Sequence, residues 1–340
     1  MSSQMQYQPE WVREDFVDFV VEKINPVWAW KRVKATIVAK QWLSDDFLQI
    51  TLRPNRNFKR QSFKAGQSVL CTLVIAGVRQ QRSYSIVDVL ANGDVVLAIR
   101  VQGLVSKKIA QSARGEVIEI SQPQGEFILE PHFQSVVLIA SGSGITAIYA
   151  LLKQALASQV TSVTLLYFTR DDAFHVELEA LNQQHAHFNY HHMNTNQTQQ
   201  HLDQDLLDQL VPQLSQSMTY ACGATAMMQS INRIFAERDL QSQLKQEFFQ
   251  LPVDEHQASQ PIIFARAQQQ FESKTNLLND AEFAGLRPTH GCRMGICNTC
   301  TCTKVSGSTK NILTGEIDHQ SNTQIKLCIS QAVSPVIINL

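Results

Sequence analysis

The sequence is poor in charge and has no long apolar run. Lys, Arg, Asp and Glu make up 17% of its 340 residues, below the roughly 25% typical of globular domains. The 29 basic and 30 acidic residues nearly cancel, which argues against nucleic-acid binding by overall positive charge. No stretch reaches the ~18 apolar residues of a transmembrane helix. Glu10, Glu14, Asp15 and Asp18 interrupt the N-terminal region, so we expect no secretory signal and a cytoplasmic protein.

The first part of the chain, residues 1–31, is predicted to be a helical extension. It places Phe16, Phe19, Val20 and Ile24 near one face of a helix, and we expect this face to pack on the next domain. The alternative is an anchor at a membrane surface, which would put the protein at the inner face of the membrane.

The rest of the chain divides into three units and a linker. Six short alternating segments punctuated by glycines in residues 32–131 predict a small antiparallel β-barrel. Strands alternate with helices in residues 132–250, which predicts a parallel sheet with right-handed crossovers. Residues 251–261 are expected to be a linker, and residues 262–340 a compact unit built around cysteines.

Five of the seven cysteines lie in the last 49 residues. In a reducing cytoplasm such a cluster indicates metal ligation or redox chemistry, not disulfides. Cys292, Cys297 and Cys300 have the x4–x2 spacing of plant-type ferredoxins, and Cys328 supplies a fourth thiolate. Structural zinc usually pairs two C-x2-C knuckles, so a [2Fe–2S] cluster fits better than zinc. Cys302 is predicted to be a buried neighbour, with ligation as the alternative.

The segment R-S-Y-S at residues 82–85 lies in a predicted barrel strand. Arg82 and Tyr84 share one face of that strand and offer a cation for phosphate and an aromatic wall for a flavin ring. Ser83 lies between them, and Ser85 offers a hydroxyl for the flavin nitrogen that takes a hydride. Alone, this pattern is more often a half-exposed strand than a cofactor site.

A second phosphate site is predicted about twenty residues later. Gly103 and Ser106 open an expected helix, and small residues at a helix N-terminus can bind phosphate. Two phosphate sites favour FAD over FMN.

A glycine turn follows the apolar strand VVLIA and precedes a helix. Gly142 and Gly144 would let the backbone approach a pyrophosphate, although the full GxGxxG fingerprint is missing. Arg170 follows the next strand and would meet the 2′-phosphate of NADPH; the alternatives are a solvated arginine and NADH as the substrate. Four histidines that follow Arg170 are expected to lie on a variable polar surface and not in a metal site: His185, His187, His191 and His192.

The order RxYS, GxxS and glycine turn resembles the ferredoxin–NADP reductase family, and residues 263–340 resemble a fused plant-type [2Fe–2S] ferredoxin. The resemblance implies an antiparallel flavin barrel, an α/β nucleotide domain and an α+β ferredoxin domain of the β-grasp type. It also implies that Arg100 and Val101 complete the pyrophosphate pocket, and that Thr146, Cys222 and Gly223 lie near the nicotinamide. Ser85, Thr146 and Cys222 would then be the catalytic residues.

Three further phrases resemble the electron-transfer partners of bacterial stearoyl-CoA-type desaturases: TLRPNRNF at 51–58, HGCRMGICNTCTC and LTGE. The implied function is transfer of electrons from NAD(P)H through FAD and a [2Fe–2S] cluster to a membrane di-iron desaturase of fatty acyl-CoA metabolism. The alternatives are a Rieske-type oxygenase or alkane hydroxylase as acceptor and, in another class, a redox-sensing or detoxifying electron carrier.

Overall fold

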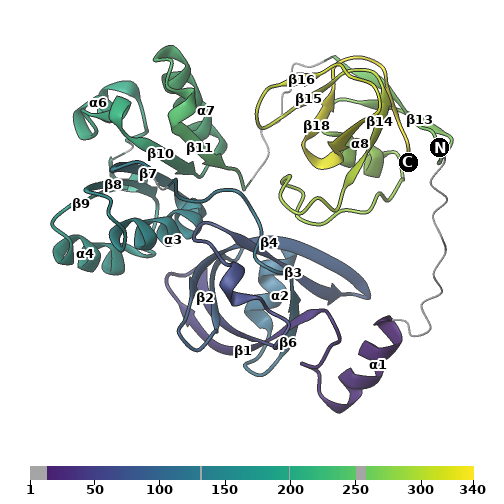
Figure 1. The fold of residues 1–340 in the computed structure, drawn as a ribbon, viewed down its shortest axis with the longest axis horizontal. Helices are drawn as coiled ribbons and strands as arrows, with labels where there is room; N and C mark the ends of the chain where they lie inside the picture. The colour runs from purple at the N-terminus through teal and green to yellow at the C-terminus, as the bar shows by residue number, and fades with distance from the viewer. Residues whose placement is uncertain (1–13, 131, 199, 250–257) are drawn as a thin grey trace.

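A computed structural model describes residues 14–130, 132–198, 200–249 and 258–340. Figure 1 shows a β-barrel, an α/β unit and a C-terminal unit, with helix α1 (Glu14–Ile24) at the outer edge of the barrel. The first thirteen residues of the predicted extension and most of the predicted linker lie outside the described residues. No helix in the described part of the chain is both long and apolar enough to cross a bilayer.

Helix α1 contacts the barrel through the face opposite to the predicted one. Phe16, Phe19 and Ile24 are 66%, 60% and 70% exposed, whereas Asp18 is fully buried. Asp18 and Glu22 form ion pairs with basic residues at the start of the barrel. The expectation that the apolar face packs on the next domain is therefore wrong, because ion pairs made by the acidic face hold the helix.

Six antiparallel strands close into a barrel in the order β1-β2-β5-β4-β3-β6, which confirms the predicted barrel. Strand β1 buries every second residue in its first half, Val33, Ala35 and Ile37. Because successive side chains of a strand point to opposite faces, this alternation produces one apolar interior. The barrel elements are β1 (Val33–Trp42), β2 (Phe47–Pro54), η1 (Arg60–Ser62), β3 (Ser68–Ile75), β4 (Val78–Val89), β5 (Val95–Arg100), α2 (Leu104–Gln111) and β6 (Val117–Ile120).

The second unit is a five-stranded parallel sheet in the order β11-β10-β7-β8-β9, which confirms the predicted parallel sheet. In β7, Val136 and Leu138 belong to one apolar core, and Val137 and Ile139 to another. Burial on both faces explains why this strand is continuously apolar. The strands are β7 (Ser135–Ser141), β8 (Ser162–Thr169), β9 (Phe188–Asn194), β10 (Met218–Cys222) and β11 (Leu244–Glu247). The helices are η2 (Gly142–Gly144), α3 (Ile145–Leu156), α4 (His175–Gln184), α5 (Thr195–Thr198), α6 (Gln204–Leu210), η3 (Leu214–Gln216), α7 (Thr225–Glu237) and η4 (Gln241–Gln243).

Strand β9 corrects the expectation for the histidines. His191 and His192 lie in this strand and not in a polar surface loop. The His192 ring stacks on His175, with 4.3 Å between ring centroids. Burial lowers the pKa of both His191 and His192, which favours neutral rings packed at the sheet edge.

The third unit combines helix α8 with a mixed five-stranded sheet, β13-β12-β19-β14-β17, and a small sheet, β16-β15-β18. Leu277 and Leu278 of α8 are fully buried in one core with Cys300, Cys302 and Cys328. The elements are β12 (Gln260–Phe264), β13 (Gln269–Ser273), α8 (Leu277–Phe283), β14 (Thr301–Ser306), β15 (Thr309–Asn311), β16 (Ile317–Asp318), β17 (Thr323–Lys326), η5 (Leu327–Ile329), β18 (Ser330–Ala332) and β19 (Val336–Ile338).

Candidate functional site

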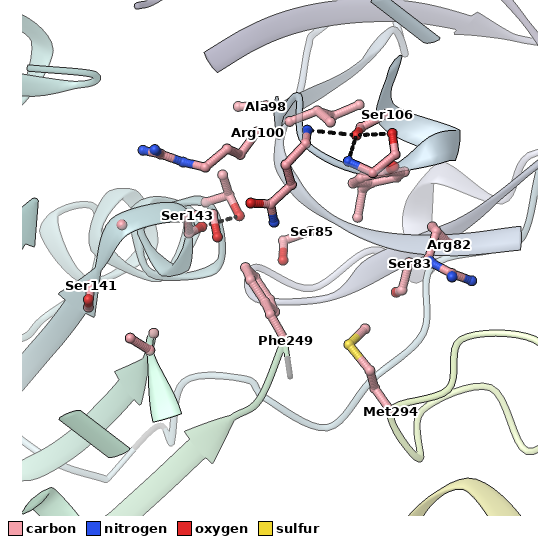
Figure 2. A pocket seen from close by; sticks show the side chains of 18 of the residues that line it. Arg82, Ser83, Ser85, Ala98, Arg100, Ser106, Ser141, Ser143, Phe249 and Met294 are labelled. Atoms are coloured by element: carbon pink, nitrogen blue, oxygen red, sulfur yellow. Dashed lines mark hydrogen bonds between the residues drawn. The ribbon is translucent and has the colours of Figure 1, made fainter. Parts of the chain in front are cut away.

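A cavity of about 780 Å³ is lined by residues from all three units. Its walls come from β4, the β5–α2 turn, the start of α3, the segment after β10, Phe249 and the cysteine loop at 292–294. Figure 2 shows Ser85, Phe249 and Met294 converging on the same space from three different elements. A cavity of this size can enclose a large organic ligand.

The R-S-Y-S segment of β4 forms the barrel wall of this cavity. The Ser85 hydroxyl is buried, and no group in the described residues hydrogen-bonds it. Buried polar atoms normally have a partner, so this hydroxyl fits a ligand with a polar edge. Burial, and then the nearby Arg293, lower the pKa of Arg82. Burial raises the pKa of Tyr84.

The start of α2 is fixed by a local hydrogen-bond network. The Ser106 hydroxyl accepts from the backbone N–H of Gln102 and Gly103, at 3.1 and 3.0 Å. It also donates to the Gly103 carbonyl at 3.0 Å. This network orients the N-terminus of α2 toward the cavity, which Gly103 and Ser106 both line.

Arg100 joins the barrel to the α/β unit. Its guanidinium donates to Asp46 at 3.0 Å and to Asp171, in the loop after β8, at 2.5 Å. It also lies 5.1 Å from the ring centroid of Phe47. Arg100 lines the cavity, whereas Val101, which is predicted beside it, does not and packs against the barrel core.

The glycine turn after β7 forms the opposite wall. Gly142 and Thr146 line the cavity, and the Thr146 hydroxyl donates to the Ser143 carbonyl at 3.0 Å. Gly144 does not line it. Arg170 also lines the cavity and has an exposed side chain.

Cys222 lies at the end of β10, beside this turn, but the cavity is lined by Gly223 and not by Cys222. The Cys222 thiol is fully buried in the core. Burial, and then the nearby Glu247, raise its pKa well above the ordinary value. Burial raises the pKa of Glu247 to about 8, and its Oε2 atom has no hydrogen-bond partner among the described residues.

The sequence analysis missed Glu247 and Phe249. Glu247 is the last residue of β11, and Phe249 follows two residues later. This four-residue strand, LKQE, has no apolar pattern. The paired aromatics after it were the one available signal.

The four predicted ligand cysteines form two pairs. The Cys300 and Cys328 sulfurs are 3.3 Å apart. The backbone N–H of Cys292 donates to the Cys297 sulfur at 3.2 Å, and that of Cys297 donates to the Cys292 sulfur at 3.3 Å. Nowhere in the described chain do three or more His, Cys, Asp or Glu side chains form a group arranged to hold one metal ion. Two thiolate pairs match the donor set of a two-iron cluster, with two ligands per iron.

Backbone N–H groups of the loop point at these sulfurs. Met294, Ile296 and Cys297 place their N–H groups 3.3–3.4 Å from the Cys292 sulfur. Gly295 donates to the Cys328 sulfur at 3.3 Å. Gly295 has φ of +78°, and a Cβ atom there would lie 2.9 Å from Ile329, so glycine permits this close approach.

The paired thiols have divided acidities. The hydrogen bond from Cys292 lowers the pKa of Cys297 to about 4, and that from Cys328 lowers the pKa of Cys300 to about 7. The same hydrogen bonds raise the pKa of Cys292 and Cys328. Each pair therefore has one readily formed thiolate, the form that binds metal. Cys302 belongs to the same buried core as Cys300 and Cys328 but to neither pair, and burial raises its pKa to about 12.

The cysteine loop also lines the cavity beside the R-S-Y-S segment of β4. Cys292, Arg293 and Met294 line the cavity together with Arg82 and Tyr84. Arg293 is held by Glu282 of α8 through two hydrogen bonds of 2.9 and 2.5 Å. The loop that holds the thiols is thus one wall of the same cavity.

Comparison with known proteins places these features in a family. The Oxidoreductase FAD-binding domain model matches residues 34–128, and the Oxidoreductase NAD-binding domain model matches residues 138–233. An NADPH oxidoreductase of Mycobacterium tuberculosis is 25% identical, covering 93% of this chain and 86% of its own. Phthalate dioxygenase reductase of Burkholderia cepacia is 24% identical over 90% of this chain and 96% of its own.

Solved structures show the same fold. A structure of phthalate dioxygenase reductase matches with a TM-score of 0.60 and 24% identity, and covers 90% of this chain and 97% of its own. A ferredoxin NADP+ reductase from Neisseria gonorrhoeae with bound FAD and NADP matches with a TM-score of 0.57 and 17% identity, covering 64% of this chain and 99% of its own.

The barrel, the parallel sheet and the cavity between them define an NAD(P)H-dependent oxidoreductase with an FAD-binding and an NAD-binding domain. The chain belongs to the ferredoxin–NADP reductase family of flavoprotein reductases.

Proposed function

We propose that this enzyme passes electrons from NAD(P)H through FAD to a [2Fe–2S] cluster on Cys292, Cys297, Cys300 and Cys328, and from there to a terminal oxygen-using enzyme. The observation behind this proposal is that the loop with three of these cysteines lines the same cavity as the R-S-Y-S strand. The third unit, with its mixed sheet and α8, is proposed to be a ferredoxin domain of the β-grasp type.

When bound, the flavin would accept a hydride and the cluster would carry single electrons onward. The Ser85 hydroxyl would hydrogen-bond the polar edge of the flavin ring, because it has no hydrogen-bond partner among the described residues. Tyr84 would form an aromatic wall, and Arg82 with the N-terminus of α2 would bind phosphate. The N–H groups of the cysteine loop would stabilise negative charge on the sulfurs.

On the nucleotide side, Gly142, Thr146 and Gly223 would surround the nicotinamide half of the substrate. The fully buried Cys222 would act through the position of the Gly223 backbone and not by direct contact. Arg170 would bind the 2′-phosphate of NADPH, in keeping with its exposed side chain in the lining of the cavity. NADPH is therefore the proposed substrate, with NADH as the alternative.

The proposed terminal acceptor is a membrane fatty acyl-CoA desaturase, supported by the phrases TLRPNRNF and HGCRMGICNTCTC in this chain. An oxygenase is the second candidate, because several relatives are reductases of oxygenase systems, including those for phthalate, 3-chlorobenzoate and carnitine. Both candidates need the same electron relay and differ only in the docking partner.

Iron and acid-labile sulfide analysis of anaerobically purified protein tests the relay. We expect about two irons and two sulfides per chain, with flavin and cluster absorption that NADPH bleaches. A colourless protein with zinc in place of iron would contradict the proposal. Reconstitution with a purified desaturase and, separately, a Rieske-type oxygenase identifies the acceptor: the true partner gives product-coupled NADPH consumption, and uncoupled consumption with the desaturase would reject that assignment.

A further inference from the structure

Helix α1 and the segment that follows it display an unusual apolar surface. The exposed side chains are Phe16, Phe19, Val20, Ile24, Trp28 and Trp30, with exposed fractions between 44% and 70%; we call this set the aromatic stripe. Soluble proteins scatter single apolar residues over their surfaces, whereas a contiguous set indicates an interaction site. Figure 1 shows α1 on the outer edge of the barrel.

The stripe is held rigidly by polar contacts beneath it. Asp18, fully buried, accepts from the Trp30 backbone N–H at 2.6 Å and from Arg32 at 2.5 Å. Glu22 pairs with Arg32 and with Lys34 of β1 at 3.3 and 2.5 Å. The acidic side chains described on α1 therefore face the barrel, and their charge is neutralised there.

The segment that presents the tryptophans is held from below by two asparagines. The Asn55 amide donates to the carbonyls of Val27 and Arg32 at 3.0 and 3.1 Å. The Asn57 amide donates to the carbonyls of Ala29, Trp30 and Arg32 at 2.9–3.2 Å. Both asparagines belong to the phrase TLRPNRNF, which thus fixes the backbone under Trp28 and Trp30 before any partner binds.

Cations lie among the exposed aromatics. The Lys23 ammonium lies 5.5 Å from the Phe19 ring centroid, and that of Lys31 lies 5.4 Å from the Trp30 ring centroid. Both lysines are exposed. The described part of this surface is therefore apolar and basic, although the whole chain has a formal net charge of -1.

We propose that the aromatic stripe docks the enzyme on an anionic lipid bilayer. The exposed Phe, Ile and Trp side chains of the aromatic stripe need no matching groove in a bilayer, where the acyl boundary accepts apolar side chains and the headgroup region accepts tryptophan. Lys23, which is exposed beside Phe19, lies where it can extend to anionic headgroups. Of the acidic side chains described on α1, Asp18 and Glu22 pair with basic residues of the barrel, so their charge is neutralised away from the lipid.

Flotation of the full-length holoenzyme with vesicles tests this proposal without any electron transfer, so it stands or fails separately from the relay. Vesicles contain equal parts phosphatidylglycerol and phosphatidylcholine, or phosphatidylcholine alone. We expect binding to the anionic vesicles that weakens with salt, with a blue shift of tryptophan fluorescence. Phe16→Ser with Phe19→Ser should weaken binding by about tenfold or more per residue, and Lys23→Glu by about fivefold.

Trp42→Ser is the matched control, because Trp42 is 52% exposed at the opposite end of β1 and should leave vesicle binding unchanged. All variants should keep NADPH–ferricyanide activity, which shows that they fold. The proposal is overturned if the wild type ignores anionic vesicles or if the Phe16/Phe19 variant binds as well as the wild type. It is also overturned if the wild type is a dimer that does not bind lipid and the Phe16/Phe19 variant is a monomer. Binding that occurs only after residues 2–13 are removed would overturn it as well.

Discussion

Gly144 and Cys222 pack so closely that a Cβ atom on Gly144 would lie 2.0 Å from the Cys222 carbonyl oxygen. This contact joins the start of α3 to the end of β10, the two elements that carry Thr146 and Gly223 into the cavity. The glycine is therefore required by backbone packing and not by contact with a ligand.

Gly144→Ala should destabilise the protein by about 3 kcal/mol, because neither backbone can yield enough to accept a Cβ atom. Gly103→Ala is the control for stability: its φ of -102° suits alanine, and the Ser106 hydroxyl, 4.0 Å away, is the nearest neighbour. Urea unfolding followed by circular dichroism measures both. Equal midpoints for the two variants would contradict the packing argument.

Ser85→Ala should weaken flavin binding on the order of tenfold, since one hydrogen bond to the ligand is lost. The flavin-free protein should be no less stable, because the Ser85 hydroxyl has no partner in the described protein. Ser83→Ala should behave differently, because the Ser83 hydroxyl donates to Ser68 at 2.9 Å, and its loss should lower apoprotein stability. Flavin titration and thermal unfolding separate the two effects; a destabilised Ser85→Ala apoprotein would refute this role.

Arg170→Ala should raise KM for NADPH by about tenfold or more and change KM for NADH little, because the lost cation would meet the 2′-phosphate. Arg114→Ala is the control, since Arg114 is an exposed arginine in the turn before β6. Steady-state ferricyanide reduction with each nucleotide measures the ratio. A similar loss with both nucleotides would assign Arg170 a role other than phosphate recognition.

Glu247 should make stability fall as the pH rises. Burial raises the pKa of Glu247 to about 8 from an ordinary value of 4.5, so between these values the folded state binds the proton that the unfolded chain releases. Stability from this group is therefore full below about pH 4.5 and is lost as the pH rises through about 8. Glu247→Gln should flatten the fall in urea midpoint between about pH 5 and about pH 9.

Glu130→Gln is the matched control for that profile. Glu130 pairs with Lys245 of β11, the strand that contains Glu247, at 2.5 Å, and the lysine lowers the pKa of Glu130. The contribution of Glu130 to stability changes only at acidic pH. The urea midpoints of Glu130→Gln above about pH 5 should therefore vary with pH as those of the wild type do. A Glu247→Gln profile as steep as the wild-type one would show that another group causes the pH dependence.

The sequence predicted those features whose cause is local. The continuous apolar run of β7 and the alternation of β1 report burial directly. The two strands that were missed, β9 and β11, are the two edges of the parallel sheet, where a strand has one neighbour and its sequence need not be apolar. The orientation of α1 was mispredicted because it depends on ion pairs with Arg32 and Lys34, which lie outside the helix and are not part of its apolar pattern.

The same contrast between local causes and tertiary packing applies to the site. The R-S-Y-S segment and the cysteine spacing are contiguous motifs and could be found by inspection. That Phe249 and Met294 reach the cavity depends on how β11 ends and how the third unit packs on the barrel, and neither leaves a local pattern. The exclusion of Cys222 from the cavity is likewise a tertiary effect of its packing beside Gly144.

Cys297→Ser should abolish NADPH-dependent cytochrome c reduction and leave ferricyanide reduction nearly unchanged, because the first needs the cluster and the second only the flavin. Cys297 has the lowest pKa of the loop thiols, about 4, so serine removes a ready thiolate. Cys302→Ala is the control, since this buried thiol lies outside both pairs and should keep iron, sulfide and both activities. Equal loss of both activities in Cys297→Ser would contradict two separate redox sites, and loss of iron in Cys302→Ala would make Cys302 a ligand.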